Sequence, residues 1–247
     1  IFERFRDKKI TFVEVGVLNG GSLEIWKEYF HKDSRIIGID LNPECKKLEQ
    51  KGVEIFIGDQ SSDVFWDDFF KKVGKVDILL DDGGHTNLQQ IVTIVKSVKN
   101  INDDGLIITE DTHSSYMSKF GNPSKYSFIN FAKRLIDDVN YKFPNLDRFK
   151  NSLNNFIYSI TFFESLVVFH INTQKTTVNK IMTNNLNEKN IKDFRFHGLV
   201  SRSFLSNKIF FLFNFIKKFK FIIIIRYMIL RKIRFIKDKI KLKKYFM

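Results

Sequence analysis

Residues 76–100 read VDILLDDGGHTNLQQIVTIVKSVKN and contain a strand, a turn and a helix in the pattern of an α/β fold. The apolar run 76–82 predicts a strand that ends in two adjacent acids, and the glycines that follow predict a turn. Apolar residues then recur at helical spacing over 88–100, which predicts a helix. A buried charge is costly unless it is paired or bound. The two acids therefore lie either in a plain surface loop or at a place where charge is needed.

The same alternation of short apolar runs and helical segments extends along the chain in both directions. Strands are predicted at 10–18, 35–41, 53–59 and 105–111, helices at 22–30, 63–73 and 127–140, and a hairpin at 157–172 with its turn near Glu164 and Ser165. This alternation predicts an α/β fold with a mostly parallel sheet wound on both faces. Near-continuous apolar strands fit a sheet that is buried on both sides.

Acids stand at the ends of four predicted strands. They are Asp40, Asp59, the pair Asp81 and Asp82, and the pair Glu110 and Asp111. Ligands of such sheets bind beyond the carboxyl ends of the strands. We therefore expect these acids to surround one ligand site.

Composition and length narrow the class of protein. A chain of 247 residues with 43% hydrophobic content suits one folded domain plus extra segments and excludes a disordered chain. The single cysteine, Cys45, excludes an internal disulfide and favours a reducing, cytoplasmic compartment. No secretory signal is evident, and a start at Ile1 rather than Met indicates a piece of a longer protein whose N-terminal site residues are missing.

The first predicted strand runs into a glycine turn, EVGVLNGGS, residues 14–22. Its glycine spacing differs from the G-x-G-x-x-G of dinucleotide sites, and Glu14 would repel a pyrophosphate but attract a cationic ligand. Asp40 can accept hydrogen bonds from ribose hydroxyls, while Asp59 and Gln60 can face an adenine edge. Together these residues favour a nucleoside-type cofactor over a plain glycine turn.

Five motifs in order, EVGVLNGGSLEIW, GIDL, GDQSSD, LLDDGGH and ITEDTHSSY, resemble the class I S-adenosylmethionine-dependent methyltransferases, and more narrowly the metal-dependent sugar O-methyltransferases. The resemblance covers about residues 3–172 and implies a Rossmann-like fold whose sheet ends in an antiparallel strand. It implies S-adenosylmethionine and Mg²⁺ as cofactors. The implied S-adenosylmethionine contacts are Glu14, Gly16, Ser22, Asp40, Asp59, Gln60 and Asp81, and the alternative role of Asp81 is to cap its loop. One departure is Gly84, where relatives often have serine.

The resemblance also carries over a metal site and a general base. Asp82, Glu110 and Asp111 are the implied Mg²⁺ ligands, and their oxygen atoms suit such a hard cation. His85 is the implied catalytic base, because an ordinary imidazole pKa of about 6.5 suits proton removal near neutral pH. A blander alternative makes Asp81 and Asp82 caps of the helix at 88–100 and His85 a surface residue.

Two further residues of the ITEDTHSSY motif have open roles. His113 either contacts the substrate or only makes hydrogen bonds within its own loop. Tyr116 lines the acceptor pocket if the resemblance extends that far.

Positive charge gathers at one end of the chain. Residues 201–247 hold 14 lysines and arginines and one acid, so their net charge of +13 equals that of the whole chain and residues 1–200 sum to zero. This contrast predicts a methyltransferase domain at 1–172, a polar linker at 173–200 and a basic amphipathic helical tail at 201–247. The tail lacks the run of about 20 apolar residues that a membrane span needs.

The predicted tail leaves several partners open. An interfacial helix would place the enzyme on the anionic inner face of a membrane, peripheral rather than spanning. An acidic protein partner or glycosyltransferase helices are alternatives, and nucleic acid is disfavoured by the neutral front domain although basic and aromatic residues alternate. A homo-oligomer is also open.

The function expected from these residues is Mg²⁺-dependent transfer of a methyl group from S-adenosylmethionine to a sugar hydroxyl. The expected acceptor is a surface glycan, such as a capsule or a lipopolysaccharide, or a glycosylated natural product. One alternative is a catechol-type small-molecule O-methyltransferase. Another is a non-catalytic, membrane-associated protein with a degenerate methyltransferase fold.

Overall fold

The computed structural model describes residues 1–120, 124–140, 153 and 155–177, together with residues 225, 229 and 233. The chain divides into two units, Ile1–Met182 and Thr183–Met247. All strands and helices named below belong to the first unit. The predicted linker beyond residue 177 and the predicted tail lie outside the described residues, apart from three helical isoleucines at 225, 229 and 233.

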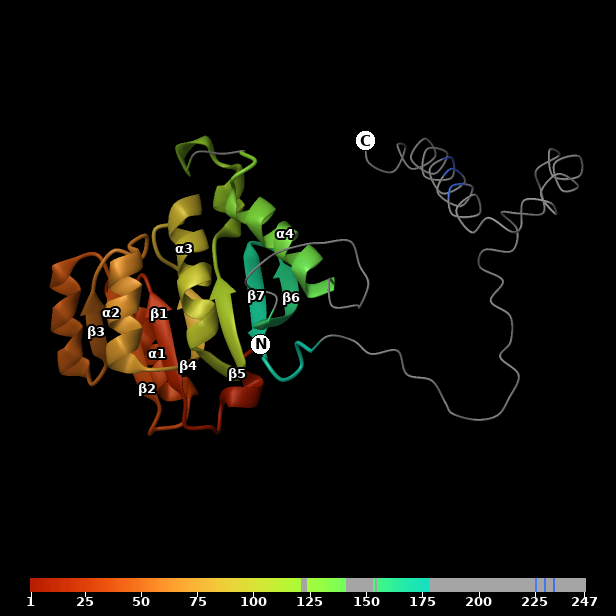
Figure 1. The fold of residues 1–247 in the computed structure, drawn as a ribbon. Coiled ribbons are helices and arrows are strands. Elements are labelled where there is room, and N and C mark those ends of the chain that lie inside the picture. Colours follow the sequence, from red (N-terminus) through yellow and green to blue (C-terminus); the bar gives the residue numbers. More distant parts are fainter. Residues whose placement is uncertain are drawn as a thin grey trace, which may run out of the picture. The chain divides into compact units, whose positions relative to one another are not determined.

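A seven-stranded sheet with the order β3-β2-β1-β4-β5-β7-β6 forms the centre of the first unit (Figure 1). The strands are β1 (Thr11–Val15), β2 (Arg35–Asp40), β3 (Glu54–Ile57), β4 (Val76–Asp81), β5 (Ile101–Thr109), β6 (Ile157–Phe163) and β7 (Leu166–Ile171). Strands β1 to β5 pair in parallel, and β7 pairs antiparallel with both β5 and β6. The predicted fold class is confirmed, including the antiparallel end of the sheet.

Helices cover both faces of this sheet (Figure 1). They are α1 (Gly21–Tyr29), α2 (Asp63–Val73), α3 (Asn87–Ser97) and α4 (Phe128–Asn140), with short 3₁₀ segments η1 (Glu3–Phe5), η2 (Pro43–Lys51), η3 (Val98–Asn100), η4 (Thr112–Tyr116) and η5 (Ser118–Phe120). Side chains of α2, α3 and α4 pack into one core with one face of the sheet. Side chains of η1, α1 and η2 pack into a second core on the other face.

Strand β4 shows why the sheet is apolar along its length. Leu79 belongs to the first core, while Ile78 and Leu80 belong to the second, because successive side chains of a strand point to opposite faces. All three are almost fully buried. Residues 78–80, which are covered on both faces, are therefore apolar, while Asp77 near the start of the strand and Asp81 at its end are polar.

The observed bounds of the helices and strands lie within three residues of the predicted ones, except at the start of β5. Strand β5 begins at Ile101, four residues before the predicted start, because the polar residues 102–104 continue the strand. Segment η2 was not predicted, although Asn42 caps it, Pro43 opens it and Gly52 ends it. The hairpin turn at Glu164 and Ser165 lies where it was predicted.

Candidate active site

The carboxyl ends of the parallel strands border a cavity of about 530 Å³. That volume lies in the usual range for small-molecule and cofactor sites. Of the predicted site residues, Gly16, Asp40, Asp59, Gln60, Asp82, His85 and Asp111 line it. The structure therefore brings together, in one hollow, residues from five separate motifs of the sequence.

The turn after β1 is shaped by Gly16 and Asp40. Gly16 has a φ of +87°, and a Cβ atom there would lie 2.2 Å from the carbonyl oxygen of Asp82, so only glycine fits. The Asp40 carboxylate accepts hydrogen bonds from the backbone N–H groups of Val17 at 3.0 Å, Leu18 at 3.1 Å and Asn42 at 2.8 Å. Asp40 thus holds the turn, and its contact with a ribose stays a prediction.

Glu14 and Ser22 form a hydrogen-bonded pair that is not part of the cavity lining. Glu14 on β1 is 2% exposed, and the Ser22 hydroxyl of α1 donates to its Oε2 at 2.9 Å. Burial raises the pKa of Glu14 to about 7, the Ser22 hydrogen bond opposes that rise, and the charges of Asp82 and Glu110 add to it. A direct contact of Glu14 or Ser22 with a cofactor stays a prediction.

Asp59 and Asp81 differ in their access to the cavity. Asp59 lines it, and one of its oxygens accepts bonds from the N–H and hydroxyl of Ser61, both at 2.8 Å. Asp81 is buried beneath the cavity, where its Oδ1 accepts from Gln60 Nε2 at 2.9 Å and from the N–H of Gly83 at 3.2 Å. Burial raises the pKa of Asp81, and these hydrogen bonds oppose the rise.

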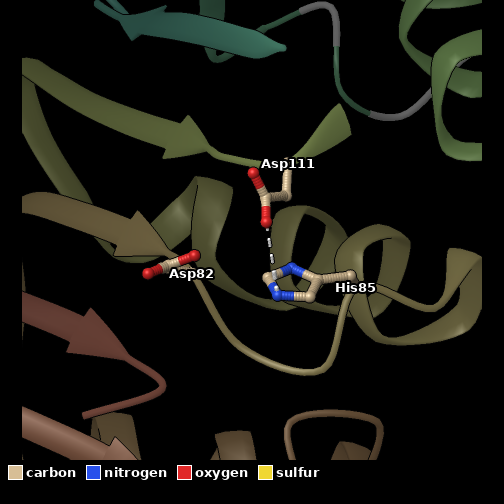
Figure 2. A group of neighbouring side chains, drawn as sticks. All are labelled: Asp82, His85 and Asp111. Carbon is tan, nitrogen blue, oxygen red and sulfur yellow. Dashed lines mark ion pairs between the residues drawn. The ribbon is translucent and has the colours of Figure 1, made fainter. Parts of the chain in front are cut away.

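Three residues that could bind a metal lie just beyond the C-terminal ends of β4 and β5: Asp82, His85 and Asp111 (Figure 2). Each offers a ligand atom within 4.8 Å of the other two, and His85 Nε2 lies 3.7 Å from Asp111 Oδ2. The predicted ligand set had Glu110 in the place that His85 takes in this group. The roles of Glu110 as ligand and of His85 as base stay predictions.

The carboxylates of this site repel one another. Burial raises the pKa of Asp82, the His85 charge opposes that rise and the Asp111 charge adds to it. Burial likewise raises the pKa of Glu110, and the charges of Asp82 and Asp111 raise it further. A cation would relieve this repulsion, and the oxygen-rich donor set suits a hard ion such as Mg²⁺. The residues therefore fit a divalent cation.

His85 is held in an unusual conformation that presents its ring to Asp111. Its φ is +58°, a value that is uncommon for a residue with a side chain. The Ser114 hydroxyl donates to the His85 carbonyl at 3.0 Å, and the Phe120 ring meets the imidazole edge to face. Within the described part of the chain, His85 Nδ1 is buried without a hydrogen-bond partner. These contacts fix the ring at the border of the cavity that it lines.

Helix α3 has a cap of its own. Thr86 accepts from the N–H of Gln89, and the Gln89 side chain accepts from the N–H of Thr86, which together form a capping box. The alternative that Asp81 and Asp82 cap this helix is therefore wrong. At Gly84 a Cβ atom would lie 2.2 Å from Gln89 Nε2, so a serine at this position would require the Gln89 side chain to move.

The two residues with open roles lie on η4 or at its edge. His113 Nδ1 lies 3.8 Å from Asp111 Oδ1 and contacts the hydroxyl of Ser165 in the hairpin turn. The N–H of Thr112 also donates to the Ser165 carbonyl, at 3.1 Å. Tyr116 is 63% exposed. His113 thus helps to tie the loop after β5 to the hairpin, and its contact with substrate stays a prediction.

Sequence reasoning missed the structural roles of Gln60 and Thr86. The Gln60 amide binds three partners in the protein, although its position after a strand suggested a ligand contact. Thr86 could have been found, because TNLQ at residues 86–89 matches the spacing of a capping box. For Gln60 the sequence holds no such signal, since its partners come from other parts of the chain.

Comparison with known proteins finds sugar O-methyltransferases among the relatives of this chain. It is 30% identical over 150 residues to 8-demethyl-8-alpha-L-rhamnosyl tetracenomycin-C 2'-O-methyltransferase of Streptomyces olivaceus, covering 57% of this chain and 39% of that protein. It is 27% identical over 153 residues to mycinamicin VI 2''-O-methyltransferase of Micromonospora griseorubida, covering 57% and 38%. The chain thus spans about two-fifths of the length of these curated relatives. No protein-family model matches the sequence.

Solved structures agree on the fold. The methyltransferase MycE of the mycinamycin biosynthetic pathway, in complex with Mg and SAH, superposes with a TM-score of 0.64 at 23% identity, covering 69% of this chain and 47% of MycE. A second crystal form gives a TM-score of 0.66 at 21% identity, covering 77% and 50%. The resemblance drawn from the sequence motifs is confirmed: the homologues are sugar O-methyltransferases, and the chain has the class I methyltransferase fold.

Proposed function

We propose that this chain is the cofactor-binding part of an O-methyltransferase that moves a methyl group from S-adenosylmethionine to a sugar hydroxyl with the help of a divalent cation. One observation carries the proposal: Asp82, His85 and Asp111 converge at the edge of the cavity, on strand ends that come from separate motifs. The named activities of the homologues and the ligands of the MycE complexes support the choice of cofactors.

Residues at different places around the cavity would have different roles. Gly16, Asp40 and Asp59 border the cavity and would face the nucleoside part of the cofactor, since ligands of such sheets bind at the carboxyl ends of the strands. Asp82 and Asp111, with Glu110 nearby, would hold the cation, whose charge offsets their repulsion and favours a deprotonated acceptor hydroxyl. His85 Nε2 would take the proton of that hydroxyl, since its ring lies at the cavity and its backbone is fixed.

A labelled-methyl assay tests the proposal. The full chain is incubated with methyl-labelled S-adenosylmethionine, Mg²⁺ and a panel of glycosylated acceptors, while calorimetry with S-adenosylhomocysteine measures cofactor binding separately. We expect cofactor binding, and transfer to a sugar hydroxyl that stops when EDTA is added. A chain that binds no S-adenosylhomocysteine, or transfers methyl equally well with EDTA, contradicts the proposal.

The acceptor that we propose is a glycan of a cell surface, and the charge pattern is the support for it. Residues 201–247 carry a net charge of +13, and the described isoleucines at 225, 229 and 233 are helical and exposed at four-residue spacing. Such spacing places them on one helix face, which suits contact with lipid beside basic residues. In the described residues no helix is both long and apolar enough to cross a bilayer.

Vesicle binding tests this membrane proposal on the full chain. We expect sedimentation with vesicles that contain anionic lipid, and weaker binding after Lys241, Lys243 and Lys244 are changed to Glu, since each basic residue near the surface contributes about 1 kcal/mol. Three exposed lysines of the first unit, Lys71, Lys72 and Lys75, changed to Glu provide the matched control. Equal loss in both variants, or equal binding to neutral vesicles, would contradict a role for the tail.

A further inference from the structure

The side chain of Gln60 lies under the loop 81–85 and makes hydrogen bonds from both ends of its amide. Its Nε2 donates to Asp81 Oδ1 at 2.9 Å and to Thr93 Oγ1 on α3 at 3.2 Å. Its Oε1 accepts from the N–H of Gly84 at 2.8 Å. Gln60 is 5% exposed, so these bonds are shielded from water and costly to lose.

The rest of the residue is anchored as firmly as the amide. The Gln60 carbonyl accepts from Trp66 Nε1 at 2.8 Å, and Trp66 is a fully buried residue of α2. The loop above is pressed against the amide, because a Cβ atom at Gly83 would lie 2.0 Å from Gln60 Oε1. Gln60 therefore connects four elements at one buried point: the end of β3, helices α2 and α3, and the loop after β4.

This bonding pattern leaves little of Gln60 for a ligand. Both amide protons are used on protein acceptors, and a glutamine amide has only those two to donate. A contact with an adenine ring nitrogen, which needs an amide proton, would have to compete with a buried bond. The geometry favours a role inside the protein over the cofactor contact predicted from the sequence.

We infer that Gln60 is a positioning residue that fixes the backbone of loop 81–85, and through it the side chains of Asp82 and His85. Two other ties flank the glycines of the loop: Asp82 N–H donates to the Val15 carbonyl at 3.0 Å before them, and Ser114 holds the His85 carbonyl after them. Between these two points, the Gly84 N–H bonds to Gln60, and the Gly83 N–H bonds to the Asp81 oxygen that Gln60 also holds, so Gln60 sets the path of the chain directly and through Asp81. The consequence for cation binding rests on the proposed function; the effect on the loop does not.

Amide hydrogen exchange of the full chain, resolved by residue, tests the inference. Gln60→Met keeps the length of the side chain and removes its hydrogen bonds. We expect exchange at the Gly84 amide to rise at least about tenfold, while the Asp82 amide, which bonds to Val15, keeps its rate. Val73→Ala, a core change far from the loop, controls for a general loss of stability. An equal rise at both amides, or an equal rise in Val73→Ala, would overturn the inference.

A second variant guards against a Gln60→Met chain that does not fold. Gln60→Glu keeps an acceptor for the Gly84 N–H but replaces the amide donor with a carboxyl group that faces Asp81, so we expect Gly84 exchange to fall between wild type and Gln60→Met. Full wild-type protection at Gly84 in a folded Thr93→Val variant is also expected, since that change removes a partner outside the loop. Gly84 exchange in Gln60→Glu as fast as in an unprotected amide would contradict the assigned bond.

Ligand titrations separate the positioning role from a cofactor contact. If Gln60 positions Asp82 and His85, Gln60→Met weakens Mn²⁺ binding at least about tenfold and changes S-adenosylhomocysteine affinity by less than about twofold. The reverse result, weaker S-adenosylhomocysteine binding with unchanged Mn²⁺ affinity, would make Gln60 a cofactor contact and overturn the inference. A wild-type chain that binds no Mn²⁺ would contradict the proposed function alone, because the exchange experiment still decides the role of Gln60.

Discussion

Changing Glu14 to Gln should make the protein more stable at high pH and leave its stability almost unchanged at low pH. Glu14 is buried, and its pKa is raised from 4.5 to about 7. The folded chain therefore binds this proton more tightly than the unfolded chain. The resulting stability is full below pH 4.5 and is lost as the pH rises through 7, which amounts to a difference of up to about 3 kcal/mol.

Glutamine mimics the protonated acid, because its Oε1 can still accept the hydroxyl of Ser22. Urea unfolding of wild type and Glu14→Gln at pH 5, 7 and 8.5, with EDTA present so that no cation alters the nearby carboxylates, measures the effect. The unfolding free energy of Glu14→Gln should rise relative to that of wild type by about 2–3 kcal/mol between pH 5 and pH 8.5. The Ser22 hydrogen bond lowers the pKa of Glu14, so Ser22→Ala in the wild-type background should move the pH at which this stability is lost to a higher value. A difference in unfolding free energy that stays constant from pH 5 to 8.5 would contradict a raised pKa of Glu14.

Three further changes test other parts of the site. Gly16→Ala should cost about 2–4 kcal/mol of unfolding free energy, because its Cβ would lie 2.2 Å from the Asp82 carbonyl oxygen at a φ of +87°; a loss below about 0.5 kcal/mol in urea unfolding would contradict this packing. Thr86→Ala should cost about 1 kcal/mol by removing the capping box of α3, and an unchanged free energy of unfolding in the same assay would contradict the assigned cap. His85→Gln should lower methyl transfer at least about 100-fold and leave S-adenosylhomocysteine affinity unchanged in calorimetry; retained turnover would remove His85 as the base.

The fold could be predicted from the sequence because its main elements are locally encoded. Helix α2 spans Asp63–Val73 as expected, with Ser62 as its cap and Gly74 after its end. Strand β5 was predicted too short, since a rule based on apolar runs does not see that Asn102 to Asp104 extend the strand. Segment η2 was overlooked despite its capping signals, because its mostly polar residues show no apolar stripe.

The sequence predicted which residues gather at the candidate site better than it predicted the contacts between them. Parallel strands must end at the same edge of the sheet, so the convergence of Asp40, Asp82 and Asp111 followed from topology. The positive φ of His85 and the exclusion of Glu14 from the cavity lining depend on packing between distant segments. Such packing leaves no periodic trace in the sequence, and the same reason hid the hydrogen bonds of Gln60.

The proposed mechanism depends above all on acids at the ends of β4 and β5 binding a divalent cation beside a methyl donor. Crystals of the chain grown with Mn²⁺ and S-adenosylhomocysteine test this most directly, since anomalous scattering locates the metal. We predict one anomalous peak within bonding distance of the Asp82 and Asp111 carboxylates, next to cofactor density in the cavity. Cofactor density without a metal peak at those carboxylates, or a peak elsewhere on the chain, would contradict the mechanism.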